Sequence, residues 1–384
     1  MINVWPFIPA GDTIETVSWL TEVHQSRASE QRVQLRQIPR RQFDFSHMLQ
    51  HKDVVAAAAL VASSTEFYVP DWTMGQIGAV PLTVGDDVVV SIDTTDLWIG
   101  VGSHVGWLKP NGQWDVTEVV DFSTTTITLA SVSESIGLAA LWLFDKAICR
   151  EGVRLETKPG GYTRGSISLE TAFSISEGSS DLSQYRGHDV FTKPPVVASG
   201  SSVSGVSWDV TDIDNSLGAP YLLRNRKNPK RTFSMRWHAL TRSDIRRNRG
   251  WIFSRKGKLK AFWLPSFQND MTAASGISSS STTLTVFAPE KALDLGGESF
   301  DIEIAGLSLY RRRVTNVTVG SPVGGKRTLD LTLDTPLGVT HLVSQLGRIN
   351  FLRCVRFDAD RIEFSHGVAA GVSVAIPCIE VPVP

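Results

Sequence analysis

The sequence predicts a mainly β protein with two tandem β-sandwich or barrel units, each carrying one short helix and an inserted small β element. Three observations support this fold class. Short apolar–polar alternations bounded by Gly, Asp, Asn and Pro recur along the chain, as in half-buried strands joined by tight turns. Helix-favouring stretches are few. A series of short matches relates the first part of the chain to the second.

Seven matches occur in the same order in both parts, and their spacing grows steadily. It rises from 189 to 207 residues through the pairs Val17–Trp19 with Val206–Trp208, Pro39–Phe45 with Pro229–Met235, Asp53 with Asp244, Phe67–Pro70 with Phe262–Pro265, Val116–Val119 with Val314–Val317, Thr126–Leu129 with Asp330–Leu333, and Arg154–Glu156 with Arg361–Glu363. Chance matches would scatter, whereas small loop insertions in a duplicated domain give a steady increase. We therefore expect an internal duplication.

The duplication predicts the domain boundaries. The first unit covers residues 1–175, with its inserted β element at about 76–145. The second covers 196–384, with its inserted element at about 271–350. Residues 176–195, rich in Ser, Gly, Asp and Pro, are the expected linker.

Each unit is expected to contain the same elements in order. An alternating strand comes first, as in Gln31–Phe45, and a helix follows. The first helix is the alanine-rich Lys52–Ser64. The second is Ser243–Gly257, with Thr241 or Ser243 as its N-cap and Gly257 as its stop. An aromatic–proline strand, several short β runs and a closing strand pair complete each unit; the first pair turns at a Pro-Gly-Gly sequence.

Bulk composition excludes several classes of protein. The formal net charge is −1, which gives no argument for nucleic-acid or membrane binding by the whole molecule. The longest apolar run, Val54–Ala62, is too short for a membrane helix, and the N-terminus does not resemble a signal peptide. We expect no membrane insertion. Three widely spaced cysteines favour reduced, buried thiols, with one disulfide possible.

No catalytic, cofactor or metal site is predicted. His47 and His51 have the spacing of a helical metal pair, but no third ligand is near, and a solvated or capping role is favoured. The acidic pairs lie in turn-like or alternating contexts, where carboxylates serve turn geometry. They are Asp86 with Asp87, Asp301 with Glu303, and Asp358 with Asp360. Nucleophile-elbow and phosphate-loop motifs are missing from the sequence, so we do not expect an enzyme.

A basic stretch between Arg224 and Lys260 holds fourteen lysines and arginines against one acid, Asp244. Three tryptophans are interleaved with it: Trp237, Trp251 and Trp263. Such a stretch suits a solvated face, pairing with acidic surfaces of neighbouring subunits, or contact with a nucleic-acid backbone and its bases. The Pro-Arg-Arg and Pro-Lys-Arg motifs occur in both units, which favours a structural role for that position.

Two stretches give the chain a resemblance to a known family. Each runs from an alternating strand through one of these motifs and a short helix to an aromatic–proline–aromatic strand. They read EQRVQLRQIPRRQFDF…EFYVPDW, Glu30–Trp72, and LLRNRKNPKRTFSM…KGKLKAFWLPSF, Leu222–Phe267. The pattern resembles the distal tail proteins of phages. The segment Val4–Val23 is also similar to tail proteins of long-tailed phages and prophages.

The resemblance implies a non-enzymatic virion protein of the tail tip or baseplate, made in the host cytoplasm. Such a protein forms a ring that joins the tail tube to the hub or fibres during assembly and DNA passage. This chain departs from the distal tail pattern by carrying two units, as tube-like hub proteins do. It would therefore assemble as a trimer with pseudo-six-fold symmetry or as a hexamer.

The expected partners are copies of itself, the tail tube and tape measure proteins, and hub or fibre proteins, with passing contact to DNA in the channel. The candidate ring-building residues are Pro39, Arg40, Arg41, Pro229, Lys230, Arg231, Arg246, Arg247 and Arg249. Two alternatives stay open: a receptor- or carbohydrate-binding module of the same particle, and a cell-wall hydrolase.

Overall fold

A computed structural model describes residues 3–25, 30–157, 162–171, 180–196, 202–208, 210–214, 216, 219, 221–224, 230–288, 299–367 and 371–382. Strands account for 58% of what it describes, and three short helices are present in these ranges, so the predicted mainly β class is confirmed. None of the described helices has the length and apolar character needed to cross a membrane. The strands in these ranges do not close into a barrel.

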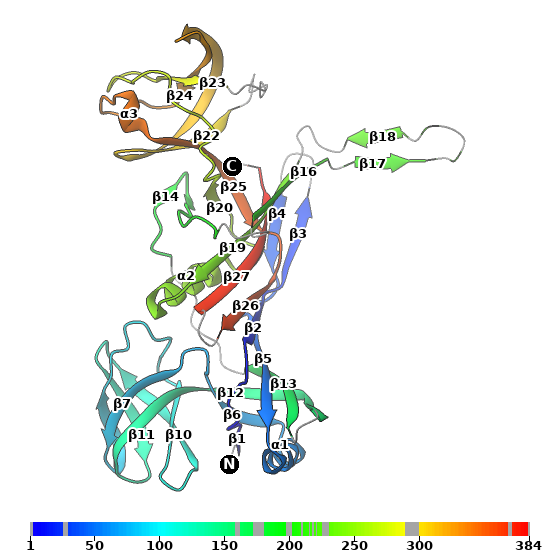
Figure 1. The fold of residues 1–384 in the computed structure, drawn as a ribbon, viewed down its shortest axis with the longest axis vertical. Helices are drawn as coiled ribbons and strands as arrows, with labels where there is room; N and C mark the ends of the chain where they lie inside the picture. The colour runs from blue at the N-terminus through cyan, green and yellow to red at the C-terminus, as the bar shows by residue number, and fades with distance from the viewer. Residues whose placement is uncertain are drawn as a thin grey trace.

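The N-terminal part, residues 3–171 of the description, holds one helix among its strands (Figure 1). Its elements are β1 (Asn3–Val4), β2 (Thr13–Ser18), β3 (Thr21–Gln25), β4 (Glu30–Gln34), β5 (Arg40–Leu49), α1 (His51–Ser63), β6 (Glu66–Pro70), β7 (Gln76–Leu82), β8 (Gly85–Ser91), β9 (His104–Leu108), β10 (Trp114–Phe122), β11 (Thr126–Val132), β12 (Ile136–Thr157) and β13 (Thr163–Thr171).

The C-terminal part, residues 180–382 of the description, has two helices. Its elements are β14 (Gln184–Tyr185), β15 (His188–Asp189), β16 (Ser202–Ser207), β17 (Val210–Ile213), β18 (Tyr221–Arg224), β19 (Lys230–Ala239), α2 (Arg242–Arg255), β20 (Phe262–Pro265), β21 (Thr283–Phe287), β22 (Phe300–Ala305), β23 (Leu309–Val323), β24 (Lys326–Leu333), α3 (Val343–Leu346), β25 (Arg348–Phe357), β26 (Arg361–Gly367) and β27 (Gly371–Glu380).

One large, mostly antiparallel sheet runs through both parts (Figure 1). Its strands pair in the order β6–β12–β13–β5–β2–β26–β27–β19–β16. The step from β2 to β26 joins the N-terminal part to the C-terminal part. Strand β2 therefore belongs to both parts at once, with β5 on one side and β26 on the other.

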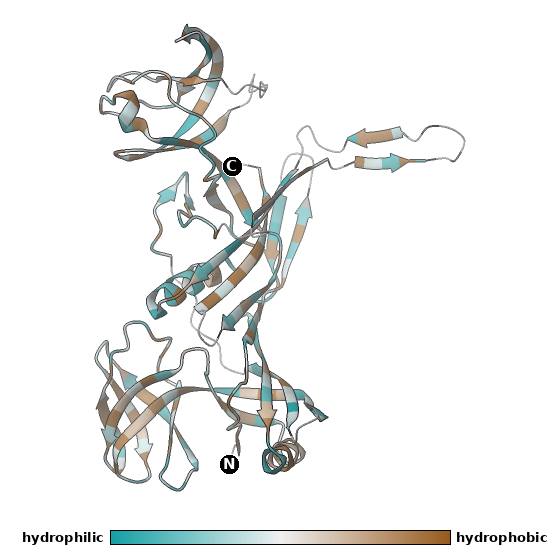
Figure 2. Ribbon diagram, in the orientation of Figure 1, coloured by the Kyte–Doolittle hydropathy of each residue, from teal (hydrophilic) through white to brown (hydrophobic). Residues whose placement is uncertain are grey.

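Alternating side chains explain why these segments form strands. In β5, Phe43, Phe45, His47 and Leu49 are buried while the residues between them face outward. Figure 2 shows the same alternation of apolar and polar residues along the strands of the sheet. The solvated or capping role favoured for His47 is wrong, because His47 is a fully buried strand residue that accepts a hydrogen bond from Trp5 at 3.2 Å.

Both predicted helices form, each with an identifiable cap. Asp53, in the first turn of α1, accepts a hydrogen bond from the Gln50 backbone at 3.4 Å. Thr241 caps α2 by accepting from the Asp244 backbone at 3.1 Å, which decides between the two expected N-caps. Helix α2 ends where Lys256 and Gly257 both take positive φ angles of 55° and 64°, as the expected glycine stop predicts.

The two predicted inserted elements have hydrophobic cores of their own. One core is built from residues between Ile77 and Leu143, and the other from residues between Met271 and Phe351. Figure 1 places them near opposite ends of the long axis of the molecule. The sheet between them has its own cores, one around α1 and one around α2.

Two features differ from the expected domain organisation. Strand β12 runs without interruption from Ile136 to Thr157, so the inserted element and the sheet share one strand instead of being separated near residue 145. The expected linker, residues 176–195, contributes Val190 and Phe191 to the cores of the C-terminal part, where both are buried. Over its described residues this segment is packed because apolar side chains within it find partners on α2 and β20.

Gly257 provides a test of the junction between the parts. A Cβ at this position would collide with the Asp360 carboxylate and lie 3.1 Å from the Cβ of Trp19. We expect Gly257→Ala to lower the free energy of unfolding by about 2–4 kcal/mol, combining left-handed strain with overpacking. Urea denaturation measures the change.

Gly112→Ala is the matched control. Gly112 also has a positive φ, 81°, but a Cβ there meets nothing within 4 Å. Only the backbone strain remains, at about 1–2 kcal/mol. Equal losses in the two variants would contradict the proposed collision.

Candidate functional site

The junction between the two parts is a strand pairing with a charged core. Six residue pairs join β2 to β26, from Thr13 opposite His366 to Ser18 opposite Arg361. Val17 and Trp19 come from the N-terminal part but are buried among residues of the C-terminal part, with Trp19 edge-on to Phe253 at 5.4 Å. The junction is therefore part of the hydrophobic core and not a surface contact.

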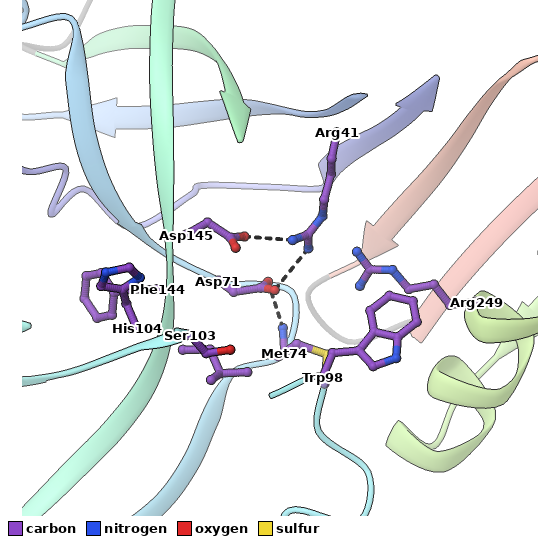
Figure 3. Close-up of a pocket in the computed structure, with 10 residues that line it drawn as sticks. Arg41, Asp71, Met74, Trp98, Ser103, His104, Phe144, Asp145 and Arg249 are labelled. Atoms are coloured by element: carbon purple, nitrogen blue, oxygen red, sulfur yellow. Dashed lines mark hydrogen bonds and ion pairs between the residues drawn. The ribbon is translucent and has the colours of Figure 1, made fainter. Parts of the chain in front are cut away.

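Arg41 organises a buried ionic network at this junction. It lies on β5 and is 5% exposed. Its guanidinium donates to Glu15 at 2.6 Å, to Asp145 at 2.8 Å and to Asp71 at 3.2 Å. Figure 3 shows Asp71, at the end of β6, and Asp145, on β12, converging on Arg41. One cation therefore fixes three strands of the N-terminal part.

The C-terminal part completes the network through Glu15. Arg249 of α2, 2% exposed, donates to Glu15, and His366 of β26 lies 2.9 Å from the other carboxylate oxygen. The Arg249 guanidinium also stacks on Trp98 at 4.3 Å. Glu15 is fully buried on β2, so its charge is balanced by cations from both parts of the chain.

Burial and neighbouring charges act on the acids of the network in opposite ways. Burial alone would raise the pKa of Glu15, but Arg249 and Arg41 outweigh it and hold that pKa well below its usual range. Burial would likewise raise the pKa of Asp71, yet Arg41 keeps it lowered. Burial does raise the pKa of Asp145 to about 6, because Arg41 offsets only part of the desolvation and Asp71 adds repulsion.

One ion pair and two further hydrogen bonds join the hairpin β3–β4 to the C-terminal part. Arg356 donates to both oxygens of Glu30, at 2.6 and 3.2 Å. Arg32 donates to the Leu259 carbonyl at 2.7 Å. The backbone of Thr21 donates to Asp360 at 2.7 Å. The hairpin is thus tied to the same part that receives β2.

The cavity beside the network is small. It has a volume of about 30 Å³ and is lined by residues of Figure 3, including Trp98 and His104. One water needs about 15 Å³, whereas ligand pockets span about 300–1,000 Å³. No group of three or more His, Cys, Asp or Glu residues able to hold a metal occurs within the described ranges. The charges therefore serve one another.

The candidate residues around the Pro-Arg-Arg and Pro-Lys-Arg motifs have different settings. Pro39 is half-buried and Arg40 exposed, whereas Arg41 lies in the network. Arg231 lies on β19, and its guanidinium is 3.8 Å from the Glu380 carboxylate. Pro229 and the side chain of Lys230 lie outside the described residues.

The candidates on α2 also divide. Arg246 is half-buried, and Arg247 is exposed with Asp181 at 3.5 Å. Arg249 is buried and meets Arg41 across Glu15. The structure brings Arg41 and Arg249 together, but inside one chain, so burial removes both from any contact with a neighbouring chain.

Much of the basic stretch is also engaged within the chain. Arg255 is buried and donates to Asp189 at 2.7 Å, and Arg242 donates to the carbonyls of Met74 and Gln76 at 3.0 and 3.2 Å. Asp189 belongs to the expected linker, Gln76 begins the first inserted element, and Met74 lies just before it. The acids that pair with the basic stretch lie far from it in the sequence. For this reason the sequence shows almost no acidic residues within the stretch itself.

Sequence reasoning missed the acidic members of the network and His366. Glu15, Asp71 and Asp145 occupy unremarkable alternating or turn contexts. One signal was available: Glu15 stands at an inward-facing position of a strand, between Thr13 and Val17. A carboxylate buried on a strand needs a cation beside it. Arg41 also points to the buried side of its strand, β5, and could supply that cation.

No protein-family model matches the chain, and no curated protein matches its sequence.

The network predicts unequal effects for two neighbouring arginines. Arg249→Met should lower the free energy of unfolding by about 3–5 kcal/mol, because it leaves a buried carboxylate short of one cation. Arg247→Met removes a charge from the same helix, but from a side chain that is 64% exposed, and should cost less than about 1 kcal/mol. Thermal and urea unfolding provide the comparison; similar losses would argue against the network.

Asp145→Asn should change how stability depends on pH. The pKa of Asp145 is raised in the folded state from an ordinary 3.8 to about 6, so the native protein holds this proton more tightly than the unfolded chain. Its ionisation therefore lowers stability as pH rises from about 4 to 6. The variant should gain about 2–3 kcal/mol relative to the parent between pH 4 and pH 7.

Urea midpoints measured across this range test the expectation. Asn still accepts from Arg41, so the hydrogen bond is retained. A difference between variant and parent that stays constant from pH 4 to pH 7 would show that Asp145 is not the titrating group.

Proposed function

We propose that this chain is a structural protein of a phage tail tip, in the distal tail or hub class, built from two copies of a tail-tube-like unit. Such a protein forms a ring that joins the tail tube to the hub or fibres. The observation that carries the proposal is a repetition of strand pairings. Each main pairing of the N-terminal part recurs in the C-terminal part with a fixed shift in residue number.

The longest pairing supports the repeat most directly. In β5–β13, Gln42 lies opposite Glu170. Adding 190 and 209 gives Thr232 opposite Ile379, which is a pair of β19–β27. The same two shifts convert every pair from Gln42 through Leu49 into an observed pair of β19–β27.

The pairings that flank it follow the same rule. Shifts of 189 and 190 convert the pairs of β2–β5 into those of β16–β19, for example Val17 with Arg41 into Val206 with Arg231. They also convert four pairs of the hairpin β3–β4 into those of β17–β18. Shifts of 195 and 208 convert four pairs of β6–β12 into those of β20–β25.

The closing strands need one adjustment to the sequence matches. The match of Arg154 with Arg361 implies a shift of 207. Pairing of β12 with β13 and of β26 with β27 instead implies 209, which aligns Val153 with Ile362 and Leu155 with Phe364. The match of Arg154 with Arg361 is therefore two residues out of register with the strand pairing.

Structural roles fit the observed chemistry better than binding or catalysis. The buried charges are satisfied within the chain, and the cavity beside them is water-sized. Of the eleven tryptophans only Trp208 is exposed, at 42%, whereas a sugar-binding platform needs several. Inserted elements at opposite ends of the molecule are positioned to hold further tail components such as fibres.

The repeat also suggests the assembly. Two units that pair edge to edge within one chain would, if copies pair likewise, form a ring with twice as many units as chains. A trimer would then present six similar units to a six-fold tube, and a hexamer is the other option. DNA would pass through the channel of the ring.

Imaging and native mass measurement test this function. The purified chain should form closed rings at micromolar concentration, and antibodies against it should label the tips of tails in particles that contain it. A chain that stays monomeric at all concentrations, or tails that carry no label at the tip, would contradict the proposal.

A further inference from the structure

Two strand segments of the described chain have a strand neighbour on one side and none on the other. Strand β16 pairs on one side only, with β19. The end of β12, Gly152–Thr157, pairs on one side only, with β13. An unpaired edge exposes backbone donors and acceptors that readily receive another strand.

These two edges are the counterparts of the two strands that meet at the internal junction. By the shifts given above, β16 corresponds to β2, and Gly152–Thr157 corresponds to the residues of β26. Inside the chain β2 and β26 are partners. Each counterpart therefore has the geometry to be paired but lacks its partner within the described chain.

Two side chains, one on β16 and one just after it, are exposed where their counterparts at the internal junction are buried. Val17 and Trp19, at the internal junction, are 0% and 3% exposed. Their counterparts Val206 and Trp208 are 64% and 42% exposed. An exposed valine and tryptophan at the edge of a sheet are the residues that a further strand pairing would cover.

The hairpin beyond β16 shows the same contrast. Hairpin β3–β4 is tied to the C-terminal part through Glu30, Arg32 and Thr21. Its counterpart β17–β18 projects from the body of the molecule in Figure 1, and Figure 2 shows apolar residues on it. Five of its apolar side chains are 38–64% exposed: Val210, Ile213, Tyr221, Leu222 and Leu223.

From these observations we infer that a second copy of this chain covers both features. Strand β16 of one copy pairs antiparallel with Gly152–Thr157 of the next, and hairpin β17–β18 lies over the N-terminal part of that copy. This inference rests on the proposed ring-forming function and names the surfaces that build the ring. Because the two edges differ, the contact is head-to-tail and can be repeated around a closed ring.

The internal junction fixes the register of this contact. Val17 lies opposite Ile362, and Ser18 opposite Arg361. Shifting β2 by 189 and β26 by 209 places Val206 opposite Val153, and Ser202 opposite Thr157. Valine would thus face valine at the position where the internal junction has valine facing isoleucine.

The contact between copies lacks the charge network. The counterparts of Glu15, Asp145 and Arg249 are Ser204, Arg353 and Ala58. Arg353 and Arg231 already share Glu380 within their own chain, at 3.1 and 3.8 Å. The contact between copies is consequently more apolar than the junction between β2 and β26. A second copy of the chain, which carries the same apolar hairpin, can form it without complementary charges.

Paired cysteines test the register. Val206→Cys together with Val153→Cys should give disulfide-linked oligomers under mild oxidation, because directly opposed residues have Cβ atoms within about 5.5 Å. Mixing the two single variants should give only the dimer of one with the other. The native cysteines are buried, and burial raises the pKa of Cys354 to about 12, so these thiols contribute little background.

Val206→Cys with Leu155→Cys is the matched register control. Leu155 lies on the same face as Val153 but two positions along, at a diagonal distance of about 7–8 Å that a disulfide cannot span. Both positions accept a cysteine at the surface or near it, and unchanged urea midpoints of the reduced variants verify folding. Cross-links in the control and none in the test pair would overturn the register.

Val206→Lys tests the surface without cysteine chemistry. It should weaken self-association at least tenfold in sedimentation velocity, because it buries a charge at the edge pairing. Val89→Lys, at another strand position that is also 64% exposed, should leave association unchanged. Equal effects of the two lysines would overturn the assigned surface.

The outcomes separate this inference from the proposed function. Rings that form without the Val206–Val153 cross-link would overturn the inferred surfaces and leave the ring function standing. Cross-linked rings absent from phage tail tips would overturn the proposed function and leave the surfaces standing. A cross-link from Val206→Cys to a different tail protein would overturn the choice of a second copy as partner, and a persistent monomer would overturn both.

Discussion

The structure depends on a buried carboxylate that cannot be satisfied by one part of the chain alone. Glu15 lies on the strand shared by both parts and takes one arginine from each. Removing an ionised carboxylate from water costs several kcal/mol unless cations compensate it. The two parts can separate only by exposing this charge, with Val17 and Trp19, or by leaving it unpaired. The pairing of β2 with β26 and the pairing of Glu15 with its two arginines therefore form and break together.

That constraint joins the two parts of the chain in one sheet. The strand β2 pairs with β5 on one side and β26 on the other, and the contacts of Glu30 and Thr21 tie the hairpin to the C-terminal part beside it. The outer elements have independent cores, so sequence changes there need not disturb the junction. A scaffold of this kind suits a protein whose proposed work is to hold others at set positions.

The sequence predicts much of the fold because local signals suffice for it. Alternation marked the strands, and capping residues marked both long helices. It favoured a solvated or capping role for His47 and took residues 176–195 for a linker, because the burial of His47, Val190 and Phe191 depends on surfaces formed by distant residues. The charge network was missed for the same reason: Arg41 and Arg249 are visible as charges, but their common acid is set by the pairing of β2.

Strand β12 has a mechanical consequence. Its 22 residues extend from the first inserted element, where it pairs with β7 and β9, into the sheet, where it pairs with β6 and β13. A pull on the outer element along this strand would load its hydrogen bonds to β6 and β13 in shear, many at once rather than one after another. Tension on that element would thus pass into the shared sheet before the element itself peeled away.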